Sequence, residues 1–206
     1  MSHHQQPSEV RDTQYLHSDL IVASHAAVEL AMDRTRRPAS QRLESRYWAT
    51  VGHIVSWELH NELETRLHGE VAWFKDRGFL AMVPRGQNVA IRLGRCDTNG
   101  RPSDTTDRDT GTPYRAFLDG LPVLFEDSPL RPVFGGYCLR RFSLDRQEQL
   151  EVDRFVLAKF SGQEHDWSWG LDPAERGEVR SVLDGKARRV EVVPTFIDVP
   201  RQRRMG

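Results

Sequence analysis

One segment of the sequence, residues 41–67, contains residue types whose spacing could support chemistry: His53, Trp57, His60 and Glu64. In an α-helix these positions recur on one face, because residues three, four and seven apart lie on the same side. A carboxylate can orient an imidazole as a general base, and two imidazoles can supply two metal ligands. We therefore take His53, His60 and Glu64 as the candidate catalytic residues.

Two other interpretations of this face stay open. Metal-binding helices usually place their histidines four residues apart, whereas His53 and His60 are seven apart, and no third ligand is apparent in the sequence. A tryptophan on a mixed polar face is typical of a partner-binding surface, with Trp57 as its anchor. Simple packing of the same side chains against a sheet is the third interpretation.

A polar connector at residues 96–111 is flanked by the second group of candidates. Arginine beside aromatic side chains is typical of phosphate or nucleic-acid binding. The interleaved Asp104, Asp107 and Asp109 nearly cancel that charge. The predicted binding residues, including the tryptophan above, are Trp57, Arg92, Arg95, Arg101, Tyr114 and Arg140.

No metal and no cofactor is predicted. The connector echoes a calcium loop at residues 97–100, but Arg108 stands where the bidentate glutamate belongs. Cys96 and Cys138 have no histidine or cysteine partner at zinc-ligand spacing. They could face each other across a sheet, but we favour two small reduced core residues. The sequence also lacks the glycine-rich phosphate loop, the serine-nucleophile elbow and the H-E-x-x-H motif.

Composition restricts the class of protein further. A chain of 206 residues with 38% hydrophobic content suits one domain of ordinary size. A net charge of -1 argues against a protein dedicated to coating nucleic acid, although a local basic patch is compatible with it. No stretch reaches the roughly 18 apolar residues that a membrane span needs, and the polar start is unlike a secretory signal. We therefore predict a cytoplasmic protein with no membrane contact.

Two predicted helices and a sheet must position the candidate residues. The first helix follows Ser18 as its N-cap, and the second runs from Gln41 to about Leu67, with Gly69 after it. Between residues 71 and 171, short apolar or alternating runs separated by turn residues predict antiparallel strands. An edge strand within residues 190–199, interrupted by a proline, is a further possibility.

The predicted fold class is α+β, with two N-terminal helices packed on a twisted antiparallel sheet of about five or six strands. Residues 1–15 are expected to form a disordered leader, and residues 16–171 a single domain. Residues 172–206 are expected to form a polar C-terminal extension.

Residues 88–171 carry a resemblance to a group of known sequences. The order is an NVAIRLGRCD strand, a GRP-containing connector, YRAFLDGLP, a GGYCL strand and a final strand with the pair Trp167 and Trp169. It resembles uncharacterised small bacterial proteins encoded beside regulators that join a helix-turn-helix to an ImmA-type peptidase domain, in toxin–antitoxin-like or prophage loci. The resemblance implies one member of a two-protein module and carries over no catalytic residues.

Two functional hypotheses follow. The first is the interaction component of a bacterial toxin–antitoxin-like or phage-defence module, which contacts a protein partner encoded nearby. The alternative is a nucleic-acid-acting, nuclease-like toxin that uses His53, His60 and Glu64 with the arginines near the connector. Whether the protein is an enzyme therefore stays open between them.

Overall fold

The computed structural model describes residues 5–35, 45–76, 79–102, 130–144, 147–161, 164–175 and 177–198. The helices among them are α1 (Ser8–Asp12), the 3-10 turn η1 (Gln14–Leu16), α2 (His17–Arg34), α3 (Ser45–Arg66) and α5 (Glu178–Leu183). The strands are β1 (Val71–Asp76), β2 (Phe79–Pro84), β3 (Val89–Cys96), β4 (Arg131–Leu144), β5 (Gln147–Ser161), β6 (Glu164–Pro173) and β7 (Val192–Phe196).

The seven strands of the described residues form one sheet in chain order, which confirms the α+β class and corrects the predicted number of five or six strands. The additional strand is β7, which pairs antiparallel with β6 and lies where the sequence suggested a possible edge strand within residues 190–199. Pro194 is tolerated there because a proline on an edge strand has no N–H to leave unpaired. The sheet is also not wholly antiparallel, since β3 and β4 run parallel. Parallel neighbours need a long crossover connection, and the chain between Cys96 and Arg131 is long enough for one.

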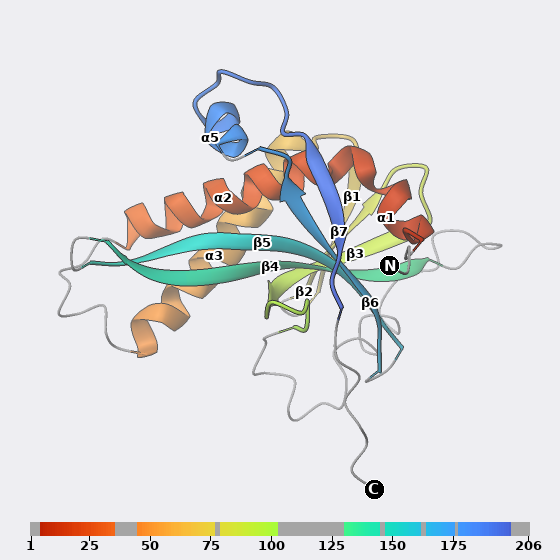
Figure 1. The fold of residues 1–206 in the computed structure, drawn as a ribbon, viewed down its shortest axis with the longest axis horizontal. Helices are drawn as coiled ribbons and strands as arrows, with labels where there is room; N and C mark the ends of the chain where they lie inside the picture. Colours follow the sequence, from red (N-terminus) through yellow and green to blue (C-terminus); the bar gives the residue numbers. More distant parts are fainter. Residues whose placement is uncertain are drawn as a thin grey trace, which may run out of the picture.

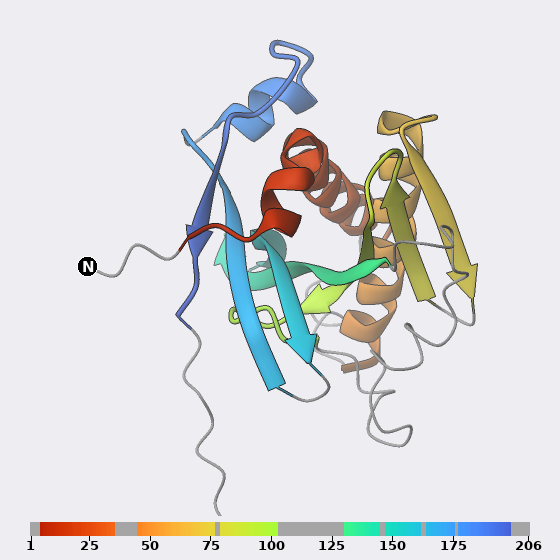
Figure 2. The same cartoon turned by 90° about the vertical axis from the view of Figure 1, so that its right-hand side faces the viewer.

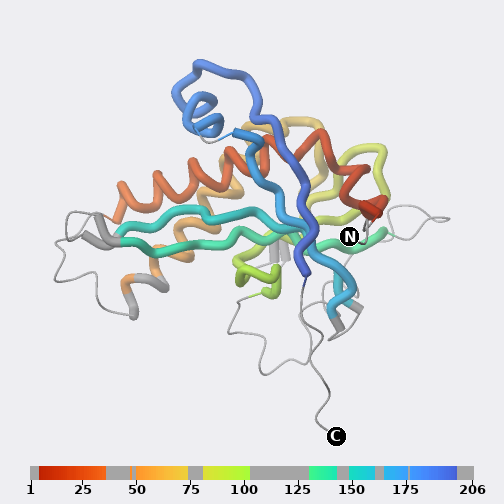
Figure 3. The backbone as a smooth tube through the Cα atoms, in the orientation of Figure 1, coloured from red at the N-terminus to blue at the C-terminus, as the bar shows by residue number. Residues whose placement is uncertain are grey.

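The curved sheet packs one face, the helix face, against α2 and α3 (Figures 1 and 2). Successive side chains on a strand point to opposite faces, so Ile91 on β3, Tyr137 on β4 and Phe155 on β5 meet the helices in one apolar core. Figure 2 shows β1 and β2 beside α3, and β6 and β7 at the opposite end, towards α2. The long β4–β5 hairpin runs alongside α2 (Figure 3).

Residues 8–15, which we expected in a disordered leader, instead belong to α1 and η1, and two ion pairs hold this segment. Glu9 is 6% exposed, and its carboxylate lies 3.0 Å from the Lys159 ammonium group. Arg131 at the start of β4 makes a second ion pair with Asp12. Because these partners lie more than a hundred residues away in sequence, local composition did not indicate that this segment is ordered.

Two further expectations at the ends of elements are wrong. α2 begins at His17, so Ser18 lies inside the helix, where its hydroxyl accepts a hydrogen bond of 2.9 Å from the Val190 N–H. Val190 and Val179 are buried in the main core, so the segment from residue 172 to β7 is part of the folded body. These contacts are non-local and leave no pattern in the flanking sequence.

His17 predicts a pH dependence of stability. Its side chain is 1% exposed, and burial lowers the pKa of His17 from 6.5 to about 4, partly opposed by a hydrogen bond with the Val10 backbone. The unfolded chain therefore takes up a proton at a higher pH than the folded chain does. This stabilising contribution is complete above pH 6.5 and decreases by about 3 kcal/mol as the pH falls to 4.

The measurement is urea unfolding of the wild type and of His17→Gln at pH 7 and pH 4. We expect the substitution to reduce the difference in unfolding free energy between the two pH values. Gln5→Ala, at an exposed position without a titrating group, is the control and should leave that difference unchanged. An identical pH dependence in His17→Gln and the wild type would contradict the assignment.

The crowding around Gly136 on β4 predicts that a larger side chain at this position destabilises the fold. A Cβ placed there would lie 2.4 Å from the Cys96 Sγ and 2.6 Å from the Phe134 ring. We expect Gly136→Ala to lower the unfolding free energy by about 1–3 kcal/mol through overpacking. Gly52 on α3 is the control, because a methyl group added there meets no neighbouring side chain within 4 Å and alanine favours helix by roughly 0.5–1 kcal/mol. Urea midpoints should therefore shift in opposite directions.

Candidate functional site

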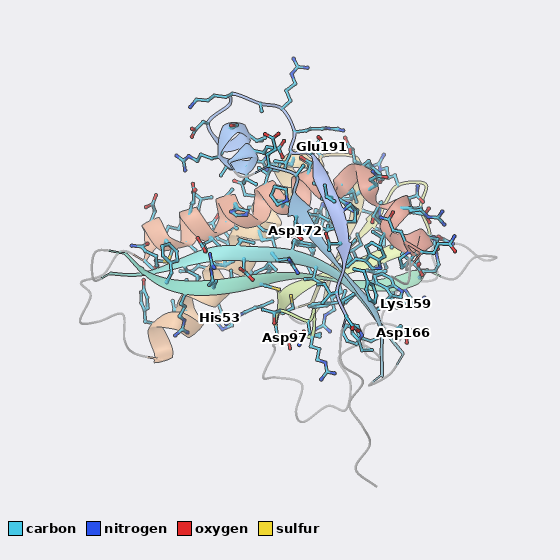
Figure 4. All side chains as sticks on the ribbon, viewed as in Figure 1. His53, Asp97, Lys159, Asp166, Asp172 and Glu191 are labelled. Carbon is cyan, nitrogen blue, oxygen red and sulfur yellow. The ribbon has the colours of Figure 1, made fainter. Side chains whose placement is uncertain are left out.

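The predicted face of α3 is placed as the helical period requires. The opposite side of the helix is fully or almost fully buried in the core: Val51, Val55, Leu59 and Leu63. The candidate face carries His53 and Trp57, both exposed, with His60 partly buried and Glu64 59% exposed at its side chain. Figure 4 labels His53 on α3 and Asp97 near the end of β3, so the candidate helix face and the connector belong to separate elements. The four residues thus form one surface, which we call the α3 face.

Trp57 is the most exposed large apolar side chain described, at 51%. The guanidinium carbon of Arg34, at the end of α2, lies 5.0 Å from the centre of its ring, which is a cation–π contact. Arg34 also pairs with the neighbouring Glu58 at 2.9 Å, and the Glu58 side chain is only 4% exposed. One arginine therefore joins the two helices by an ion pair and places its cation over the tryptophan ring.

His60 and Glu64 form the pair that the sequence suggested. The His60 Nε2 lies 3.7 Å from the Glu64 carboxylate, and the imidazole packs edge-on to Trp73 of β1 with ring centres 5.0 Å apart. The side chain of His60 is 13% exposed. His53 lies about two helical turns away from His60 on α3. The arrangement orients one imidazole beside a carboxylate, and His60 is largely enclosed by its packing on β1.

The predicted arginines are not brought together. Arg92 is 7% exposed on the outer face of the sheet, and Arg95, three residues later on the same strand, is exposed on the helix face. Arg101 is half-buried in the turn after β3. Arg140 lies beyond a bulge in β4 and pairs with Glu151 on the adjoining strand. Tyr114 lies outside the described residues, as does the connector beyond residue 102.

The described part of the connector is a tight turn. One oxygen of the Asp97 carboxylate accepts hydrogen bonds of 2.9 Å from the backbone N–H groups of Asn99 and Arg101. Ser168 on β6 donates to the Asn99 carbonyl at 2.8 Å, and His165 Nε2 lies 2.6 Å from the same hydroxyl. Asp97 therefore stabilises the turn, and the turn is tied to β6.

The His165–Ser168 pair has the residue types of a nucleophile and its base, and sequence reasoning did not identify it. Ser168 is 0% exposed, so a substrate has no path to its hydroxyl. Its proton is donated to a carbonyl, which makes His165 the donor to serine and leaves it unable to accept the serine proton. Burial lowers the pKa of His165, with the charge of Arg101 acting in the same direction. The pair is a structural clamp.

Sequence reasoning also missed a cleft of about 450 Å³ between α2, α5 and the part of the β4–β5 hairpin that contains Arg140 and Glu151. His25 and Glu29 come from α2, and Arg180 from α5 forms an ion pair of 3.0 Å with Glu29 across it. Burial lowers the pKa of His25, an effect that the nearby charge of Glu151 opposes. The lining residues come from separate elements and share no motif, so no sequence signal could have grouped them.

Comparison with protein-family models, with curated proteins and with solved structures finds no match to this chain. None of the described helices is long and apolar enough to cross a membrane. Within the described ranges, histidine, cysteine, aspartate and glutamate do not gather in any group of three that could hold a metal ion.

The Arg34–Glu58 ion pair between α2 and α3 predicts that removal of Arg34 lowers the free energy of unfolding. Removing the guanidinium in Arg34→Ala leaves the buried Glu58 carboxylate without its ion-pair partner, and we expect a loss of about 2 kcal/mol in unfolding free energy. The double variant Arg34→Ala/Glu58→Gln should recover part of that loss, because the buried charge is gone. Arg95→Ala, at an exposed position, is the control. If Arg34→Ala and Arg95→Ala had equal unfolding free energies in urea, the Arg34–Glu58 ion pair would not contribute to stability as we expect.

Proposed function

We propose that this protein is the interaction component of a bacterial toxin–antitoxin-like or phage-defence two-protein module and acts by protein–protein contact. The α3 face is its docking surface. Its partner is the protein encoded beside it, a regulator that joins a helix-turn-helix to an ImmA-type peptidase domain. The observation that carries the proposal is Trp57, half-exposed and in a cation–π contact with Arg34.

The energetics support tryptophan as the anchor. A tryptophan that is 51% exposed can bury on the order of 100 Å² more apolar surface in a complex, worth roughly 2–3 kcal/mol. Interface anchors are enriched in tryptophan and arginine and are surrounded by a polar rim. Here Arg34 supplies the second anchor, and His53 and Glu64 supply polar groups beside it.

We expect Trp57→Ala to weaken binding to the neighbouring regulator by about 30-fold, from the lost apolar contact. The measurement is isothermal titration calorimetry with the two purified proteins. Tyr15→Ala is the matched control, because Tyr15 is a large side chain that is 39% exposed on η1. Wild-type affinity in Trp57→Ala would exclude the α3 face as the docking surface, and no binding by the wild type would exclude the chosen partner.

The alternative is a nucleic-acid-acting toxin of the nuclease type, which the His60–Glu64 pair supports. Arg92 is buried and Arg95 and Arg140 lie on separate parts of the sheet, so these arginines offer no common patch for a nucleic-acid backbone, which weighs against this alternative. We expect His60→Ala to weaken partner binding much less than Trp57→Ala does, since the His60 side chain is only 13% exposed. The nuclease hypothesis requires that expression of the protein alone stops growth and that His60→Ala abolishes this effect. A growth assay with and without the neighbouring gene distinguishes the two functions.

A further inference from the structure

Cys96 and Cys138, the only two cysteines in the 206-residue chain, lie against each other. They stand in register on the parallel strands β3 and β4, and their sulfur atoms are 3.1 Å apart. Both are free thiols, 4% and 2% exposed. Because the pair is 42 positions apart in sequence, the contact exists only through the parallel pairing of the two strands.

A glycine and a small apolar cluster surround the two cysteines and leave room for their sulfur atoms to touch. The Cys96 side chain extends over Gly136, where a Cβ would come within 2.4 Å of its sulfur. Phe134 packs on the same position, and Val156 and Ala158 complete a small apolar cluster around both cysteines on the outer face of the sheet. Any side chain at Gly136 would displace the Cys96 sulfur, so the glycine keeps the two thiols together.

We propose that Cys96 and Cys138 are a covalent modification site, a dithiol that a hydroperoxide converts into an intramolecular disulfide. One thiolate attacks the peroxide oxygen, the O–O bond breaks, and an alcohol leaves with one thiol proton. The resulting sulfenic acid is attacked by the second thiol, the S–S bond forms, and water leaves. Two thiols and one hydroperoxide thus give one disulfide, one alcohol and one water, with two electrons passing from sulfur to oxygen.

The geometry allows the bond with little movement. A disulfide needs a sulfur separation of about 2.05 Å and Cα atoms roughly 4.4–6.8 Å apart. Neighbouring strands are separated by about 4.8 Å, within that range. The sulfurs therefore need to approach by only about 1 Å from their present distance of 3.1 Å. Asp97, the residue after Cys96, is exposed, so the site lies next to the protein surface.

The local hydrogen bonds determine the rate and the consequence of the reaction. The contact with Cys138 and burial both raise the pKa of the Cys96 thiol, so its oxidation should accelerate as the pH rises. Cys138 donates to the Asp97 carbonyl at 2.9 Å. Disulfide formation removes that donor and alters the support of the turn at residues 97–101. The redox state of the pair therefore acts on the start of the polar connector.

The test treats the full-length protein with hydrogen peroxide, and in parallel with diamide, which accepts the same electrons and protons without attacking methionine. Thiols are then counted by N-ethylmaleimide labelling in urea, and the intact mass is measured. We expect both thiols to disappear, the mass to fall by two hydrogen atoms in diamide, and dithiothreitol to restore both. The melting temperature of the oxidised protein should rise by roughly 5 °C or more.

Cys96→Ser and Cys138→Ser are the matched controls, and neither should show the loss of two hydrogen atoms or the rise in melting temperature. The wild-type thiol count decides the question even where a serine variant does not fold. Two thiols still labelled after either oxidant would overturn the proposal, as would a disulfide that forms only between two molecules. The result is independent of partner binding and of the α3 face.

Discussion

Parallel pairing of β3 with β4 joins the two halves of this protein. The meander β1–β2–β3 and the meander β4–β5–β6–β7 are each antiparallel, and they meet only at this boundary in the sheet. Contacts with distant segments gather along β4: Arg131 with α1, Tyr137 with α3, and Cys138 with β3. At the Tyr137 contact, the phenol oxygen and the Ser56 hydroxyl are 2.6 Å apart.

Close approach at this boundary depends on small residues. On the helix face, the Ile91 side chain fills the space beside Gly135. On the outer face, the Cys96 side chain fills the space beside Gly136. Interiors pack at nearly crystalline density, so an added methyl group has no free volume to enter. The same compactness that allows the two meanders to join also brings the two thiols into contact.

The helix pair is stabilised by apolar burial and by one ion pair with a buried carboxylate. α3 buries one apolar side against the sheet and α2, and it leaves the side with His53 and Trp57 exposed to solvent. Burying the Glu58 carboxylate would be costly without a partner, and Arg34 supplies one from the neighbouring helix. The same arginine also places its cation over the tryptophan that we propose as the anchor for a partner.

Local patterns in the sequence determined much of this structure. Helical periodicity placed His53, Trp57, His60 and Glu64 on one face, and period-two alternation located the strands, because both depend on residues a few positions apart. The sequence also suggested an edge strand where β7 lies, whereas only the tertiary structure decided the parallel pairing, the ordering of residues 8–15 and the separation of Arg92 from Arg140. It also brought Cys96 to Cys138 and assembled the cleft at His25. These features join segments that are distant in sequence, and their free energy comes from contacts that no local spacing encodes.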